Sequence, residues 1–248
     1  QTLVNKLKIS EIMKKIYVVL ICVLLSVSAS SQSFIGAWEG YHESEKGVKI
    51  KTVVTFAEGY QVMTRYEANS GKFITTNGGS WKLSGNTMTE KIEFDSSNPE
   101  RVGTEVSFKV SITNSEMAIV GSDMKLKKID NGTPGKLQGA WLMSGRIRDG
   151  KKQMRDTSGP RKTMKVLSGT RFQWIAYNTK TKKFMGTGGG TYTTINGKYK
   201  EKIEFFSRDD SKAGISLTFD YTLKDGTWNH KGFSSKGAAM HEIWSVRK

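Results

Sequence analysis

The chain has 248 residues, 36% of them hydrophobic and 10% aromatic, with 26 glycines but only 3 prolines and one cysteine. This composition is typical of a globular, turn-rich protein with one large or two small domains, and it excludes a disordered chain and a disulfide-stabilised scaffold. The formal net charge is +16, which points to an anionic partner if the charge is concentrated in one part of the chain.

The first recognisable segment is an export signal. The stretch MKKIYVVLICVLLSVSAS, which starts at Met13, has two lysines, an apolar run and then small residues. This order is typical of a secretory signal peptide, and the apolar run is too short to span a bilayer comfortably. We expect residues 1–31 to be an untranslated leader plus a signal peptide, cleaved after Ala29 or before Gln32, and the mature protein to be secreted or periplasmic.

The single cysteine, Cys22, lies inside this apolar run. Ile21 precedes it, where a lipidated cysteine follows a small residue, so we do not expect a lipid anchor. Cleavage then leaves a mature protein without disulfides, thiolate chemistry or a cysteine-metal site.

Beyond the signal, the chain repeats itself. The segment GGSWKLSGNTMTEKIEF (Gly78–Phe94) aligns without a gap with GGTYTTINGKYKEKIEF (Gly189–Phe205), an offset of 111 residues. At the same offset, Val106–Gly121 aligns with Leu217–Gly232. Two periods are too few for a solenoid, so the pattern indicates a duplicated domain.

The start of each copy sets the domain limits. IGAW ends at Trp38 and QGAW ends at Trp141, an offset of 103 residues, and a longer segment around residues 151–161 in the second copy takes up the difference. We therefore expect a first domain over 34–128, a linker over 129–137 and a second domain over 138–248.

Within each copy the apolar residues recur every second position, as in Val106–Ile112 and Leu217–Leu223. Turn pairs such as Asn196-Gly197 and Asp225-Gly226 separate these runs, and no amphipathic helix is convincing. About eight short strands per copy, each with one apolar face, predict an all-β protein of two antiparallel barrels.

Several short motifs carry a resemblance to a known group of domains. Each copy opens with Gly-x-Trp and ends in a basic strand, and the second copy also has the runs Gly188–Tyr192, Glu201–Glu204 and His241–Trp244. The chain resembles the tandem lipocalin-like β-barrel domains of unknown function from secreted bacterial proteins. The resemblance implies the fold and at most ligand binding.

The same resemblance implies structural roles for a few residues. Trp38 and Trp141 are expected to close the barrel floors, with a late cation such as Arg247 over the indole ring. Gly189 and Gly190 are expected to let a barrel strand bend, since no Gly-Lys-Ser/Thr follows them and no helix begins there, as a phosphate loop requires.

The repeated EKIEF strand predicts a polar spot inside each barrel. Alternation places Glu93 and Glu204 on the outer, solvated face beside lysines, and Glu90 and Glu201 on the inner face together with Phe205. Burying a carboxylate inside a barrel costs free energy unless it forms an ion pair, accepts hydrogen bonds or stays in contact with water. The alternatives are a wet barrel rim, a carboxylate that caps backbone groups, and simple inheritance through duplication.

The second copy replaces aliphatic residues of the first with aromatic and polar ones. Met88 becomes Tyr199 and Ile119 becomes His230, for example. Aromatic linings with a few polar groups are typical of ligand pockets, so we expect the second barrel to bind the ligand and the first to pack shut. The alternative is a core of larger residues. The candidate ligand-binding residues are Trp174, Tyr192, Tyr199, Glu201, Tyr221, Trp228 and His230.

Charge follows the same division. Residues 30–128 hold 12 basic and 12 acidic residues, whereas residues 129–248 hold 23 and 10. We expect a small amphipathic or anionic ligand, and an acidic glycan or a membrane surface as a further partner of the basic second domain, unless the charge only keeps the surface solvated. Nucleic acid is not expected, because the aromatic residues fall on inner faces.

Catalytic signals are sparse. His42, His230 and His241 lack metal-site spacing, and no Gly-x-Ser-x-Gly motif occurs, so we expect a binding protein without cofactor or metal rather than an enzyme. The alternatives are a glycan- or ester-hydrolase with Glu201 as acid or base and His230 as its partner, and a structural protein of the cell envelope.

Overall fold

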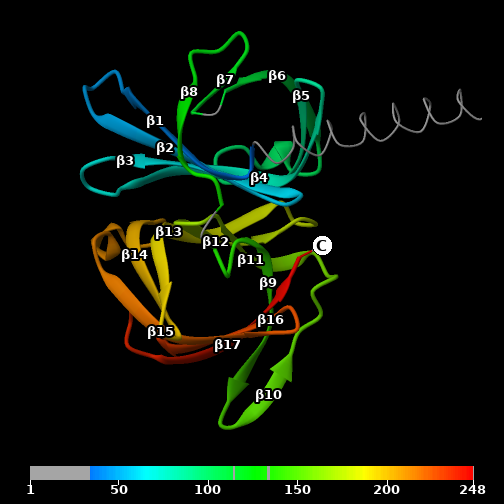
Figure 1. Cartoon of the computed structure of the whole chain (residues 1–248), viewed down its shortest axis with the longest axis vertical. Helices are drawn as coiled ribbons and strands as arrows, with labels where there is room; N and C mark the ends of the chain where they lie inside the picture. Colours follow the sequence, from blue (N-terminus) through cyan, green and yellow to red (C-terminus); the bar gives the residue numbers. More distant parts are fainter. Residues whose placement is uncertain (1–33, 114, 133–134, 248) are drawn as a thin grey trace, which may run out of the picture.

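The computed structural model describes residues 34–113, 115–132 and 135–247, so the segment expected to be an export signal, with Cys22, lies outside the described residues. The chain folds into two closed, eight-stranded antiparallel barrels that pack against one another (Figure 1). The prediction of two tandem all-β barrels is confirmed.

The first barrel follows the simple order of its strands. It consists of β1 (Gly36–Glu43), β2 (Lys49–Ala57), β3 (Tyr60–Glu67), β4 (Phe73–Ser84), β5 (Thr87–Asp95), β6 (Glu105–Ile112), β7 (Glu116–Ile119) and β8 (Lys125–Asp130), with a 3₁₀ turn, η1 (Pro99–Arg101), between β5 and β6. Each strand pairs with the next, and β8 pairs with β1 to close the barrel. Closure leaves no exposed sheet edge.

The second barrel repeats this order with one insertion. It consists of β9 (Gly139–Arg148), β10 (Lys151–Met154), β11 (Arg161–Leu167), β12 (Arg171–Asn178), β13 (Lys183–Ile195), β14 (Lys198–Phe206), β15 (Ser216–Lys224), β16 (Thr227–Phe233) and β17 (Ala239–Val246), with η2 (Asp210–Lys212) after β14. β17 pairs with β9 to close the ring, while β10 pairs only with the end of β9. The β9–β10 hairpin projects from the barrel (Figure 1) and accounts for the longer second copy.

The opening tryptophans occupy equivalent buried places. The indole nitrogen of Trp38 donates to the Phe34 carbonyl at 2.9 Å, and that of Trp141 donates to the Leu137 carbonyl at 2.8 Å. Lys128 lies over the Trp38 ring at 4.9 Å, whereas Trp141 packs edge-on against an aromatic ring of its own barrel. Each indole hydrogen bond holds in place the segment that leads into the first strand of its barrel.

A β-bulge interrupts the strand pairing at the same place in both barrels. The register shifts between Gly189 and Gly190, so that Glu204 on the neighbouring strand has no direct partner. A Cβ atom on Gly190 would lie 2.0 Å from the Lys202 carbonyl oxygen, so only glycine fits there. The bulge turns the following residue, Phe205, to the outside of its barrel, where alternation wrongly predicts an inward side chain.

The two bulges meet at the interface between the barrels. Phe205 stacks on Tyr66 of the first barrel at 4.8 Å, and its counterpart Phe94 packs on Tyr177 of the second barrel at 5.0 Å. The amide nitrogen of Gln173 donates to two equivalent threonine hydroxyls, one in each barrel, at 2.8 and 3.0 Å. The interface therefore has approximate two-fold symmetry.

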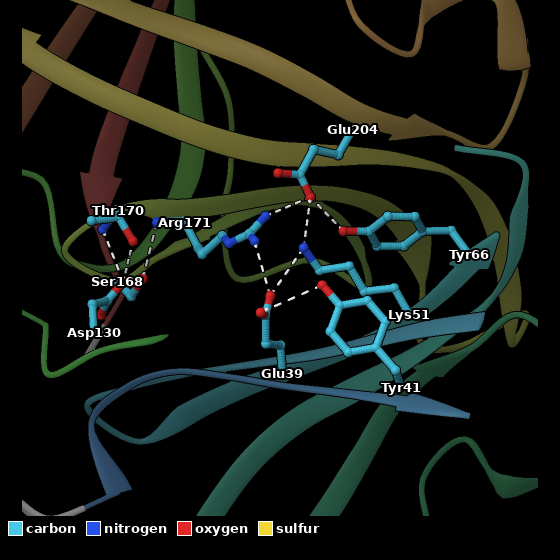
Figure 2. A network of polar contacts seen from close by, with 9 residues as sticks. All are labelled: Glu39, Tyr41, Lys51, Tyr66, Asp130, Ser168, Thr170, Arg171 and Glu204. Carbon is cyan, nitrogen blue, oxygen red and sulfur yellow. Dashed lines mark hydrogen bonds and ion pairs between the residues drawn. The ribbon is translucent and has the colours of Figure 1, made fainter. Parts of the chain in front are cut away.

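Glu204 is the centre of one half of this interface. Its carboxylate accepts a hydrogen bond from the Tyr66 hydroxyl at 2.5 Å and pairs with Arg171 at 2.6 Å and Lys51 at 3.4 Å (Figure 2). Burial alone raises the pKa of Glu204, but the charge of Arg171 and the bond from Tyr66 outweigh it and lower the pKa. The expectation that Glu204 lies on the solvated surface is wrong.

Glu93 has the matching role in the other half. It accepts a hydrogen bond from the Tyr177 hydroxyl at 2.5 Å and a bidentate pair from Arg247 at 2.7 and 2.8 Å. Its expected solvated position is wrong for the same reason, because the second barrel covers the outer face of β5. Arg247 also lies over the Tyr60 ring at 4.1 Å, so it holds the barrels together instead of covering Trp141.

Apolar side chains fill the space between these polar clusters. Met164, Val166 and Ile175 of the second barrel pack with Ala57 and Val62 of the first. The strands at the interface are therefore apolar on both faces, which removes the signal that normally separates inside from outside.

We expect Glu204→Gln to lower the free energy of unfolding by about 2–3 kcal/mol at neutral pH. The cost is below the ~3–5 kcal/mol of a fully buried pair, because Glu39 still pairs with Lys51 and Arg171. Urea denaturation measures the loss, and the exposed Glu105→Gln serves as the control. Because the folded-state pKa of Glu204 is lowered, its contribution is present above about pH 4.3 and disappears below it. Equal stability of both variants at neutral pH would contradict the assignment.

Candidate functional site

The second barrel contains a cavity of about 510 Å³. Strands β9, β11, β12 and β14–β17 form its walls, and the segments after β14 and β16 border one end. The lining residues are Met143, Arg161, Thr163, Lys165, Trp174, Ala176, Glu201, Ile203, Phe206, Arg208, Lys212, Leu217, Phe219, His230, Ser234, Ser235, Lys236, Met240, Glu242 and Trp244. The volume and the mixed aromatic and polar lining suit a small organic ligand.

A buried ion pair lies in this wall. The Lys165 ammonium donates to the Glu201 carboxylate at 2.8 Å, and both side chains are 6% exposed. The same ammonium lies 5.0 to 5.8 Å from the ring centres of four aromatic residues, Phe172, Tyr199, Trp228 and Trp244. Glu201 faces the interior, as alternation predicts, and Lys165 neutralises it there.

Sequence reasoning misses Lys165 for a definite reason. It lies between Met164 and Val166, and alternation assigns such apolar neighbours to the barrel interior. Both neighbours face the first barrel instead, which turns Lys165 inward. In the strand register Lys165 lies opposite Trp141, just as Val54 lies opposite Trp38. The second barrel therefore has a cation where the first has an aliphatic residue.

Two further titratable groups face the cavity. His230 is 1% exposed and packs on Phe219 at 4.0 Å between ring centres, and burial together with the nearby Lys165 charge holds its pKa well below the usual value. His230 is therefore neutral at physiological pH, and its Nδ1 has no hydrogen-bond partner among the described residues. Burial raises the pKa of Glu242, whose carboxylate accepts a hydrogen bond from the Trp244 indole at 3.2 Å.

The end of the cavity that the segments after β14 and β16 border is cationic. Arg161, Arg208, Lys212 and Lys236 all line it. Burial and the neighbouring charges of Arg155 and Arg208 lower the pKa of Arg161, which shows that like charges lie close together. Arg208 also lies over the Trp174 ring at 5.9 Å. Only Lys212 among the four has an ion-pair partner in the described chain, Asp209 at 3.8 Å, so the positive field is largely unopposed.

The predicted ligand-binding residues fall into three groups. Trp174, Glu201 and His230 line the cavity. Tyr199 and Trp228 pack around Lys165 behind its wall. The other two do not line it: the Tyr192 hydroxyl donates to the Ser168 carbonyl at 2.5 Å, and Tyr221 packs against the edge of the core.

The first barrel also contains a cavity, of about 320 Å³, so the expectation that its aliphatic lining packs shut is wrong. Four methionines, whose flexible side chains leave irregular gaps, line it: Met63, Met88, Met117 and Met124. Glu90 and Val54 both line this cavity, and Lys165 of the second barrel occupies the position equivalent to Val54. Burial raises the pKa of Glu90 to about 7, against a smaller opposite effect of Arg101.

Two further features of the described residues bear on function. No group of three or more His, Cys, Asp or Glu side chains among them is placed to hold a metal ion. None of the helical segments in residues 34–113, 115–132 and 135–247 has the length and apolar character needed to cross a membrane.

No protein-family model matches the chain, and no curated protein gives a significant match to it. The cavities and their charges are therefore the basis for assigning a function.

We expect Lys165→Met to lower the free energy of unfolding by about 3–5 kcal/mol, because Glu201 is left buried without a partner. Lys165→Met combined with Glu201→Met should recover most of this loss, since it removes both charges from the interior. Chemical denaturation of the wild type, both single variants and the double variant gives the coupling energy. Additive losses in the double variant would show that the pair does not interact.

Glu90 should make the stability of the first barrel fall as pH rises. Its folded-state pKa of about 7 exceeds the unfolded value of about 4.3, so the folded chain binds the extra proton between these values. Glu90→Gln should flatten the stability profile over this range and stabilise the protein above about pH 7, by up to about 3 kcal/mol. Urea denaturation across the range measures this, with the exposed Glu116→Gln as control. An unchanged profile in Glu90→Gln would refute the assignment.

Proposed function

We propose that the protein binds an amphipathic anion in the cavity of the second barrel. One observation carries the proposal: a cavity of about 510 Å³ with an aromatic and aliphatic lining ends at a cluster of cations that is largely unopposed. The cavity provides apolar contact, and the cations provide the charge complement.

The arrangement suits a ligand with two unlike ends. Its apolar part lies among Trp174, Phe206, Leu217 and Met240, where water is displaced from hydrophobic surface. Its carboxylate, sulfate or phosphate group lies at Arg161, Arg208 and Lys236. Arginine is suited to such groups because its planar fork can donate two hydrogen bonds to one anion.

Binding is favoured over hydrolysis by the state of the candidate catalytic groups. Glu201 is paired with Lys165 at 2.8 Å, and His230 packs against Phe219 at 4.0 Å between ring centres, with the rings tilted by 36°. A general acid or base must reach the proton that it transfers, which neither contact favours. If the protein is a glycan- or ester-hydrolase, chromogenic esters and glycosides will be turned over, and Glu201→Gln will abolish turnover while binding persists.

The first test identifies what the cavity holds. The protein is purified from its native host, bound molecules are extracted, and mass spectrometry is used to identify them. We expect an anionic amphiphile, and from the export signal expected in residues 1–31 we propose that it is bound outside the cytoplasm. The proposal would be contradicted if a neutral or cationic molecule were recovered at one per protein and were lost when Arg161 or Arg208 is substituted.

The second test measures the charge preference directly. Dodecanoate should bind about tenfold or more tightly than dodecanol in isothermal titration calorimetry, since tenfold corresponds to only about 1.4 kcal/mol. Arg161→Gln combined with Arg208→Gln should remove this preference. The matched control, Lys200→Gln with Lys202→Gln, changes the same charge on the exposed outer face of β14 and should keep it. Equal losses in both variants would show a general charge effect instead of a site.

A further inference from the structure

The cavity of the first barrel presents an amide oxygen that no donor satisfies and a carboxylate that no cation pairs with. Gln61 is 1% exposed and lines the cavity, and its Oε1 has no hydrogen-bond partner among the described residues. Glu90 lines the same cavity, is half-buried and makes no ion pair with the described residues. A buried acceptor such as Gln61 Oε1 costs free energy unless a donor reaches it.

Strand register places these two side chains on the same wall of the cavity. Gln61 on β3 pairs with Gly79 on β4, and Glu90 on β5 pairs with Trp81 on the other edge of β4. The two acceptors thus face one cavity from the strands on either side of β4. Gly79 has no side chain to separate them.

The nearby cations do not satisfy Glu90. Val54 stands where the second barrel has Lys165, so the counter-ion of Glu201 has no equivalent here. Arg101 lines the cavity, but its guanidinium is paired with Asp95 at 2.7 Å. The remaining lining is mainly aliphatic, aromatic and methionine side chains, apart from one amide, Asn77.

We infer that the first barrel binds an amphipathic amine, whose ammonium group pairs with Glu90 and donates to Gln61 Oε1 while its apolar part lies among the methionines. An ammonium group brings the donors and the positive charge that both acceptors lack. Phe56 and Phe108 also line the cavity, and aromatic faces attract cations. This site is separate from the anion site of the second barrel and has the opposite charge preference.

Glu90 limits the pH range of amine binding. Its pKa of about 7 leaves it ionised above that value, whereas an alkylamine keeps its proton up to about pH 10.4. Affinity should therefore be highest between these limits and fall on both sides. Arg101 and its partner Asp95 are the other charged groups nearby.

The test compares three ligands that share one chain. Octylamine, octanol and octanoate are titrated into the full chain at about pH 8 by isothermal titration calorimetry, a value between the two limits above. Octylamine should bind to the first barrel about tenfold or more tightly than octanol. The preference should disappear when the pH falls to about 5.5, where Glu90 is protonated. Octanol binding as tightly as octylamine at about pH 8 would overturn the inference.

Two variants locate the site. Glu90→Gln should lose the amine preference and keep octanol binding, and Gln61→Leu should weaken amine binding by about threefold or more, the loss of one hydrogen bond. Glu105→Gln, an equal charge change on the outer face of β6, should bind octylamine like the wild type. The Arg161→Gln and Arg208→Gln variant should also keep amine binding, which separates this site from the anion site. Octylamine affinity unchanged in Glu90→Gln would overturn the inference.

Discussion

The whole arrangement depends on two carboxylates, Glu93 and Glu204, that lie at the β-bulges and face the neighbouring barrel. Each is largely buried between the barrels and needs partners there. Glu93 meets Tyr177 and Arg247 from across the interface, whereas Glu204 meets Tyr66 and Lys51 from across it and Arg171 of its own barrel. Removing one partner of a buried ion pair costs more free energy than forming the pair contributes. The pairs therefore determine how the barrels meet more than they add to stability. The apolar residues between them supply the hydrophobic contribution.

This interface explains which predictions from sequence are correct. The alternation of apolar residues, the turn pairs and the duplication are local or repeated signals, and they predict the two barrels and the inward Glu201. They fail where one barrel covers a strand of the other. Phe205 is misassigned because the β-bulge moves it to the outer face, and the solvated position expected for Glu204 is wrong because the first barrel covers that face. Lys165 is missed because its neighbours Met164 and Val166 are apolar although they face the first barrel. No pattern within one strand reports which of its faces another domain will cover.

The candidate site shows the same limit. His230 is found by comparing the two copies, Glu201 by alternation along its strand, and Trp174 as an aromatic residue expected on an inner face. Lys165 could also be found by comparing the two copies, because the offset of 111 aligns it with Val54. The cations Arg161 and Arg208 are brought together only by closure of the barrel, between strands that are far apart in sequence.

The contacts between the barrels have the reciprocity of a symmetric dimer. Glu93 meets Tyr177 while Glu204 meets Tyr66, and the two tyrosines are equivalent in the duplicated sequence, as in an isologous interface between identical subunits. The cations do not follow this symmetry. Arg247 pairs with Glu93, whereas both Arg171 and Lys51 pair with Glu204. A fused pair of barrels needs no identical halves, so each interior was free to change. As a result, one duplicated carboxylate, Glu201, has Lys165 as an internal counter-ion. The other, Glu90, has none, because Val54 occupies the position equivalent to Lys165.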